Sequence, residues 1–202
     1  MEFLRNPGFV GTIGLLAVIV LMLSILIFGF RNDSFSFLND FISKLGAEGE
    51  PNALWFNLMC FVMVGIILFV FGLAYGLLLK DKLLSTFLSF FGVGFAFSAI
   101  PFDAELPKAS LSTAHVVAIC LGLVFWMFGL SRIGYNQQIE KSVRNRANFS
   151  AIALVISMAG FGLGLWSMPI THRLVFGVVF GWTAVTSILL LSQGDKKGIK
   201  QE

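Results

Sequence analysis

The sequence predicts an all-α protein, a polytopic membrane bundle of six transmembrane helices. The bundle forms a single domain over residues 1–202, with a short interfacial helix in its first outer loop. Composition is the first reason: 57% of the residues are hydrophobic and 12% are charged, about half the charged share of an ordinary soluble domain. The second reason is a series of long apolar runs with few or no charges. For most of this chain the solvent is therefore lipid.

The first span covers residues 8–30, which contain no charged side chain. At ~1.5 Å per residue, a helix of that length crosses a hydrocarbon core of ~30 Å. A secretory signal peptide is excluded as an explanation. The apolar run is longer than the usual hydrophobic region of a signal, and Arg31, Asn32 and Asp33 stand where a small-residue cleavage site would be needed.

Five further apolar segments follow, each bounded by charges or by Pro and Gly. They cover residues 53–79, 83–101, 111–131, 148–168 and 174–192. Transmembrane strands are excluded, because strands would give alternating segments of about ten residues rather than unbroken apolar runs.

The distribution of basic residues predicts the orientation. Ten of the fourteen Lys and Arg residues fall on one side of the six predicted spans. These are Arg5, Lys80, Lys82, Arg132, Lys141, Arg144, Arg146, Lys196, Lys197 and Lys200. The positive-inside rule places that side, with both termini, in the cytoplasm, and places the protein in the cell membrane. Nucleic-acid binding gains no support, because the basic residues lack an aromatic reading pattern.

The first outer loop predicts the interfacial helix. Apolar side chains recur from Phe35 to Leu45 at intervals of three and four residues, and Gly46 provides a natural stop. Such an amphipathic segment is expected to lie on the bilayer surface. Asp40 and Lys44 are correctly spaced for an ion pair on one helix face.

Small residues within the spans indicate close contacts between helices. Gly72/Gly76, Gly160/Gly164 and Gly177/Gly181 are each four residues apart, which predicts close internal packing of these helix faces. Cys60 and Cys120 both lie inside predicted spans, where we interpret them as small apolar residues rather than a disulfide or a metal site.

Polar residues gather at the outer end of the predicted bundle. Pro101 and Pro169 are expected to end the third and fifth helices, and Ser110 to cap the fourth. Ionisable groups near membrane depth are costly unless they are paired or functional. We therefore expect an outward-facing polar pocket, with seven candidate ligand-binding residues: Ser43, Asn57, Asp103, Glu105, His115, His172 and Arg173.

Three stretches resemble a known family. "ISKLG", "PNALWFN" and "AIPFDAELPKASLSTAH" resemble the DUF998 family of small prokaryotic membrane proteins, with its Ser-x-Leu-Gly loop, an Asn early in the second helix, and an apolar-Pro-acid loop before a His. The resemblance implies no activity. It singles out Ser43, Gly46, Asn57, Pro101, Asp103 and His115.

Four functional hypotheses remain open at this stage. In the first, the pocket binds or moves a lipid or small amphiphile, with Arg173 gripping an anionic headgroup. In the second, the protein is a membrane hydrolase with zinc held by His115, His172 and Asp103. Bis-histidine haem is the third. In the fourth, the polar residues only pair with one another, and the protein is a structural or accessory subunit or a homo-oligomer.

Overall fold

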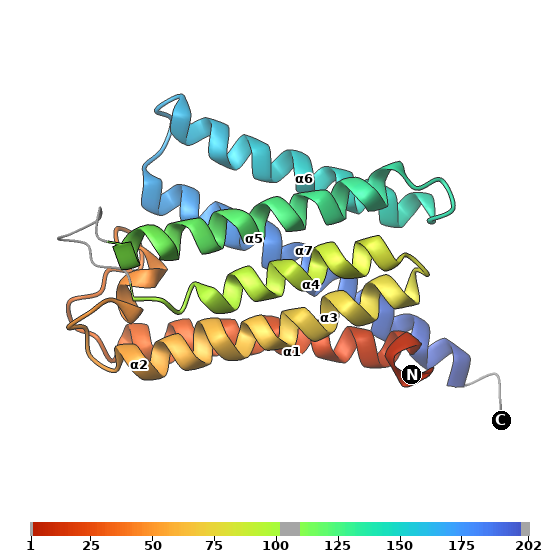
Figure 1. The fold of residues 1–202 in the computed structure, drawn as a ribbon, viewed down its shortest axis with the longest axis horizontal. Helices are drawn as coiled ribbons and strands as arrows, with labels where there is room; N and C mark the ends of the chain where they lie inside the picture. The colour runs from red at the N-terminus through yellow and green to blue at the C-terminus, as the bar shows by residue number, and fades with distance from the viewer. Residues whose placement is uncertain (1, 102–109, 199–202) are drawn as a thin grey trace.

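The computed structural model describes residues 2–101 and 110–198, and within these ranges every regular element is helical. The long helices run antiparallel to their chain neighbours, and both termini lie at one end of the bundle together with the α3–α4 turn and the α5–α6 connection (Figure 1). The long helices are α1 (Pro7–Phe30), α3 (Val64–Leu78), α4 (Lys82–Phe97), α5 (Ser110–Tyr135), α6 (Lys141–Gly162) and α7 (Met168–Gly198). The short elements are η1 (Glu2–Arg5), η2 (Ile42–Gly46), α2 (Ala53–Phe56) and η3 (Asn57–Met63). The all-α prediction is confirmed for the described residues.

Four helical stretches of the described chain are long and apolar enough to cross a membrane. They are Pro7–Phe30, Ala53–Leu78, Ser110–Tyr135 and Met168–Gln193. Helix α4 is also apolar but has only 16 residues. Helix α6 has 22 residues, and its first two turns carry Lys141, Arg144 and Arg146. The chain is thus a multi-pass membrane protein by the length and composition of its helices.

Helices α3 and α4 form a close pair in the bundle. Gly72 lies against the backbone of Leu88 and Ser89, and Gly76 lies against Ser85, so that a methyl group at either glycine would meet atoms at 2.2–2.7 Å. The Ser85 hydroxyl donates a hydrogen bond to the Leu73 carbonyl oxygen at 3.1 Å. The predicted internal packing of this glycine pair is confirmed.

The turn between these two helices carries a buried carboxylate. Asp81 caps α4 by accepting a hydrogen bond from the Leu84 N–H at 3.0 Å, and its other oxygen accepts one from Arg132 Nε at 2.8 Å. Burial raises the pKa of Asp81, but the Leu84 N–H and the Arg132 guanidinium outweigh that effect and hold the pKa below its usual value. The contact ties the start of α4 to the end of α5.

One predicted helix boundary is wrong, and two helices differ in extent from the predicted membrane spans. Helix α4 ends at Phe97, so that, as expected, it does not continue through Pro101. Pro169 does not end α6. It lies in the first turn of α7, where a missing N–H costs nothing. Helix α6 begins at Lys141 rather than near residue 148, since its polar first turns continue the helix into the α5–α6 connection.

The first outer loop does not form the predicted amphipathic helix. Only η2 (Ile42–Gly46) is helical, and the preceding residues form turns. The reason is local competition for backbone groups. The Ser36 N–H donates to the Asp40 carboxylate at 2.8 Å, and the Asn39 N–H donates to the Ser36 hydroxyl at 3.2 Å. Side chains that bind the backbone in this way stabilise turns in place of a helix.

Helix geometry also changes between α2 and α3. The segment η3 (Asn57–Met63) is a π-helix, a wider turn inserted between two α-helical stretches. Its first residue, Asn57, is a buried polar side chain. Wide turns of this kind occur frequently at functional sites.

Candidate functional site

A cavity of about 300 Å³ lies among α4, α5, α6 and α7, with η2 residues at one end. Its walls are mainly apolar and aromatic: Phe91 and Phe95 come from α4, and Phe176 and Phe180 come from α7. The polar groups at its walls are Ser43, His115, Cys120, Thr171 and His172. An apolar cavity of this size with a few polar groups is the usual form of a small-molecule site.

The cavity has a mouth on the side of the bundle. Among its lining residues, Val116 on α5, Met158 on α6 and Met168 on α7 are each about half exposed. Cys120 on α5 is also exposed. The lining residues Phe41 and Ser43, by contrast, come from the first outer loop, and Ser43 is buried. The mouth therefore lies among helices, and the loop covers the end.

His115 occupies the α5 wall of the cavity. Its side chain is buried, and its Nδ1 lies 3.0 Å from the Ile100 carbonyl oxygen. Because a carbonyl oxygen only accepts, Nδ1 carries the proton in this contact, and in the neutral imidazole Nε2 is the acceptor. The ring also meets the edge of Phe61, with the centroids 6.1 Å apart. His115 thus ties α5 to the chain that follows α4.

His172 occupies the opposite wall, one turn inside α7. Its ring packs on Phe176 with the centroids 4.7 Å apart, and it meets Phe41 of the outer loop at 5.9 Å. Its Nδ1 is buried and has no hydrogen-bond partner among the residues that the structure describes. A buried polar atom without a partner costs about 1–3 kcal/mol, so a ligand group that bonded this nitrogen would recover that energy.

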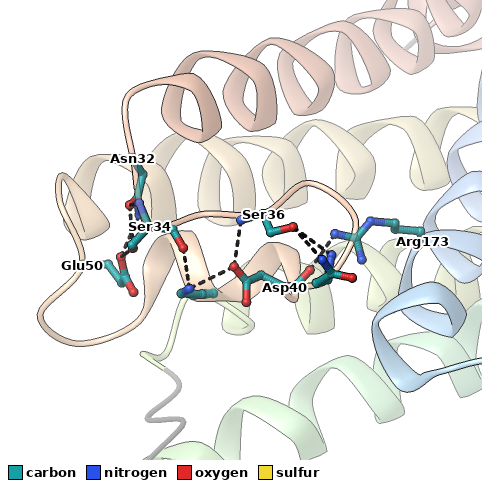
Figure 2. Close-up of polar contacts among 8 residues, drawn as sticks. Asn32, Ser34, Ser36, Asp40, Glu50 and Arg173 are labelled. Carbon is teal, nitrogen blue, oxygen red and sulfur yellow. Dashed lines mark hydrogen bonds and ion pairs between the residues drawn. The ribbon is translucent and has the colours of Figure 1, made fainter.

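Arg173 holds the outer loop onto α7 and does not point into the cavity. Its Nε donates to the Phe37 carbonyl oxygen at 2.6 Å, Nη2 to the Asp40 carbonyl oxygen at 2.6 Å, and Nη1 to the Pro169 carbonyl oxygen at 2.8 Å. Figure 2 shows the guanidinium reaching from α7 into the loop. All three nitrogens of the guanidinium are therefore engaged with backbone.

Side chains within the loop complete this network (Figure 2). Lys44 Nζ lies 2.9 Å from the Asp40 carboxylate, which confirms the predicted pair. Burial raises the pKa of Asp40, but the Ser36 N–H and the Lys44 ammonium outweigh it and hold the pKa below its usual value. Further along, the Asn32 amide donates to the Glu50 carboxylate at 2.7 Å. The two ends of the loop are joined by this bond.

Asn57 fixes the last part of the same loop. Its amide Nδ2 donates to the Gly46 carbonyl oxygen at 2.9 Å, in a buried contact. A methyl group on Gly46 would lie 1.9 Å from Asn57 Oδ1, so only glycine fits. This contact positions η2, which contributes Ser43 to the cavity wall.

The structure brings three of the seven candidate residues to one cavity: Ser43, His115 and His172. Asn57 and Arg173 instead hold the loop that covers it. Asp103 and Glu105 lie outside the described residues. Sequence reasoning missed Thr171 and Cys120, which line the cavity but resemble ordinary helix residues. Thr171 directly precedes His172 in the sequence, and this adjacency is the signal from which its place at the cavity could have been predicted.

A metal site gains no support from the described residues. Within residues 2–101 and 110–198, no group of three His, Cys, Asp or Glu side chains is placed to hold a metal ion. The zinc hypothesis needs Asp103 as its third ligand, and this residue lies in the undescribed stretch.

The comparison with protein families shows to which family the chain belongs. The model of the family described as "Protein of unknown function (DUF998)" matches residues 15–193. The chain belongs to the DUF998 family. The family expected from the three stretches is thereby confirmed, and the matched range includes the whole described cavity. No curated protein and no solved structure gives a significant match.

Two of the stretches that suggested the family meet in the structure. The Ser-x-Leu-Gly loop is η2, and the Asn of the second helix is Asn57, which binds the glycine of that loop. The third motif leads to His115, whose Nδ1 contacts the residue before Pro101. The described residues that the resemblance singled out thus lie at the outer loop and the adjoining cavity wall.

Proposed function

We propose that this DUF998 protein crosses the cell membrane with six helices and binds a lipid or small amphiphile in the cavity beside His172. The six spans are the stretches Pro7–Phe30, Ala53–Leu78, α4, α5, α6 and α7. Both termini and the basic turns share one end of the bundle (Figure 1). Because cytoplasmic loops are enriched in Lys and Arg, we assign this end to the cytoplasm. The cavity then lies toward the outer leaflet.

The observation that carries the binding proposal is the buried Nδ1 of His172 at the wall of an apolar cavity. The aromatic walls suit a hydrocarbon portion, and the histidine nitrogens with the Ser43 and Thr171 hydroxyls suit a polar headgroup. The half-exposed residues at the mouth lie on helices that face the bilayer in this topology. A lipid-soluble ligand would enter from the membrane rather than from water.

The test is native mass spectrometry of gently solubilised protein, with lipid extraction from the same sample. Cys120→Trp places a bulky ring at the cavity mouth, and His172→Phe keeps the aromatic volume while removing the nitrogens. Val124→Trp is the matched control, because Val124 is an exposed residue of the same helix outside the cavity. We expect wild type and Val124→Trp to carry a bound amphiphile that both cavity variants lose.

Two results would overturn the binding proposal. One is wild-type protein that is folded but empty, and the other is an amphiphile retained equally in Cys120→Trp and His172→Phe. Metal analysis of the same samples distinguishes the hydrolase hypothesis from amphiphile binding. Stoichiometric zinc that disappears in His115→Ala would favour hydrolysis over amphiphile binding.

A further inference from the structure

A second hollow lies between α6 and α7 and shares no lining residue with the cavity beside His172. It has a volume of about 540 Å³ and reaches along α7 from Arg173 to Val185. At ~1.5 Å per residue that length is ~18 Å, which is enough for an extended hydrocarbon chain. Its lining is apolar apart from Arg146, Ser150 and Arg173. We call this hollow the α6–α7 groove.

Two glycines form part of the groove wall and leave it open. No atom of the described protein lies within 4 Å of the position that a methyl group would take on Gly177 or Gly181. The predicted internal packing of this pair is therefore wrong. On Gly160 of α6, by contrast, a methyl group would lie 2.0 Å from the Trp166 ring. The face of α7 with Gly177 and Gly181 is thus unfilled by the described part of the chain.

Two arginines line the groove, and they differ in their hydrogen bonds. Arg146 is the one with an unpartnered nitrogen in the described part of the chain. Its Nε is buried and has no hydrogen-bond partner among residues 2–101 and 110–198. Arg173, at the other end, is bound through all three guanidinium nitrogens to backbone carbonyls. Helical side chains lean toward the N-terminus of their helix, so Arg146 leans toward the end of α6 that begins at Lys141. A negative group at that end would complement it.

The apolar stretches of the helices hold no counter-ion for Arg146. Residues 7–30, 53–78, 82–97, 110–135, 141–162 and 168–193 contain no Asp or Glu, so the apolar stretch of a helix from a second copy would bring no carboxylate into the groove. Asp195 of α7 lies beyond that stretch. At this end of the bundle, the described carboxylate of Asp81 is paired with Arg132, and that of Glu140 accepts from the Ser142 hydroxyl. A molecule with an anionic head and an apolar tail would supply the missing charge and also fill the apolar groove.

We propose that the α6–α7 groove binds an anionic phospholipid of the cytoplasmic leaflet, with its phosphate on Arg146 and one acyl chain over Gly177 and Gly181. A guanidinium binds phosphate oxygens through two parallel N–H bonds, which suits arginine better than lysine. The site is separate from the cavity beside His172. Its assignment to the cytoplasmic leaflet rests on the orientation proposed above.

The experiment uses the full chain in phosphatidylcholine nanodiscs that contain a phosphatidylglycerol probe with a photoreactive acyl chain. Cross-linked peptides are mapped by mass spectrometry, and the yield on residues 174–185 is measured. Arg146→Gln removes the charge, and Gly181→Leu fills the groove. The controls are Arg144→Gln, which removes a charge two residues away on a different face of α6, and Gly162→Leu, which adds the same bulk at another glycine with open space around it.

We expect Arg146→Gln to lower the yield about tenfold or more, the loss typical of a hydrogen bond to a charged group. Gly181→Leu should lower it similarly, while both controls and Cys120→Trp leave it unchanged. Insensitivity to Cys120→Trp separates this site from the outer cavity. The proposal would be overturned if unlabelled phosphatidylcholine competed with the probe as well as unlabelled phosphatidylglycerol does, or if Arg146→Gln left the yield unchanged. Either result would show that the groove makes only nonspecific lipid contacts. A dimer in wild type that Gly181→Leu dissociates would assign the groove to a second copy.

Discussion

Replacing Gly46 by alanine is expected to disconnect the outer loop from the second helical stretch. The added methyl group would lie 1.9 Å from Asn57 Oδ1, whereas ordinary van der Waals contact begins at 3.4 Å. The Asn57 amide must therefore move away, and its 2.9 Å hydrogen bond to the Gly46 carbonyl oxygen is lost in a buried setting. Leaving such groups unsatisfied costs about 1–3 kcal/mol of unfolding free energy.

A double-mutant cycle isolates this contact. Asn57→Ala removes the same hydrogen bond without a clash, and we expect it to cost about 1–2 kcal/mol. In the double variant the methyl group on residue 46 meets no amide, so the combined loss should not exceed that of Asn57→Ala alone. The coupling energy between the two positions then equals the loss caused by Gly46→Ala alone, about 1–3 kcal/mol, which is above the ~0.5 kcal/mol within which independent sites add.

The assay is a denaturing-detergent titration that follows the reactivity of the Cys60 thiol. Cys60 is fully buried and lies three residues after Asn57, so it reports unfolding close to the contact. The exposed Cys120 is replaced by serine in every protein compared, which leaves one reporting thiol. Strictly additive losses from the two substitutions would refute the reasoning, because they would show that Gly46 and Asn57 act independently.

Three further substitutions test other parts of the fold. Arg173→Lys should raise hydrogen exchange in residues 34–46, because one ammonium cannot bind the three carbonyls that the guanidinium holds; unchanged exchange would show that the loop stands without it. Asp81→Asn should lower the unfolding free energy at pH 7 by roughly 1 kcal/mol, since the partner Arg132 is half exposed. Burial raises the pKa of Asp81, but its hydrogen bonds and the charge of Arg132 lower it by more, so that the folded value lies below the ordinary one. The stability that it provides is therefore present above the ordinary value of 3.8 and is lost as the pH falls through the lower folded value. The gap between wild type and Asp81→Asn should narrow below that pH in a denaturation series, and a constant gap would contradict this origin. Gly76→Ala should destabilise by about 1–3 kcal/mol through overpacking against α4, measured by the same thiol titration, and a neutral effect would show that α3 and α4 separate easily.

Composition and periodicity were enough to predict the helices but not where they end. The uncharged apolar run that starts at residue 8 is compatible only with a membrane-spanning helix, and α1 covers it from Pro7 to Phe30. Near Pro169 the prediction failed because proline is compatible with more than one local outcome. It can follow a helix at a distance, or it can begin the next one.

The candidate site was predicted in part for a similar reason. Titratable side chains in a membrane protein are conspicuous, so His115 and His172 were found, and both line the cavity. Arg173 was equally conspicuous, but its role depends on carbonyls of residues more than a hundred positions earlier in the chain. The aromatic wall could not be predicted, because nothing in the sequence separates Phe95 or Phe176 from the many phenylalanines that face lipid.

The π-helical turn at Asn57–Met63 has a consequence for how this chain tolerates changes in length. It holds one more residue per turn than its flanks, and each residue of an α-helix rotates the following face by about 100°. Deleting a single residue there would convert the turn to α-helix and swing Asn57 away from Gly46, while α3 kept its place against α4. One extra residue in the π-helical turn therefore fixes how the outer loop is oriented relative to α3. A one-codon deletion in this turn would change the position of the loop before it changed the packing of α3.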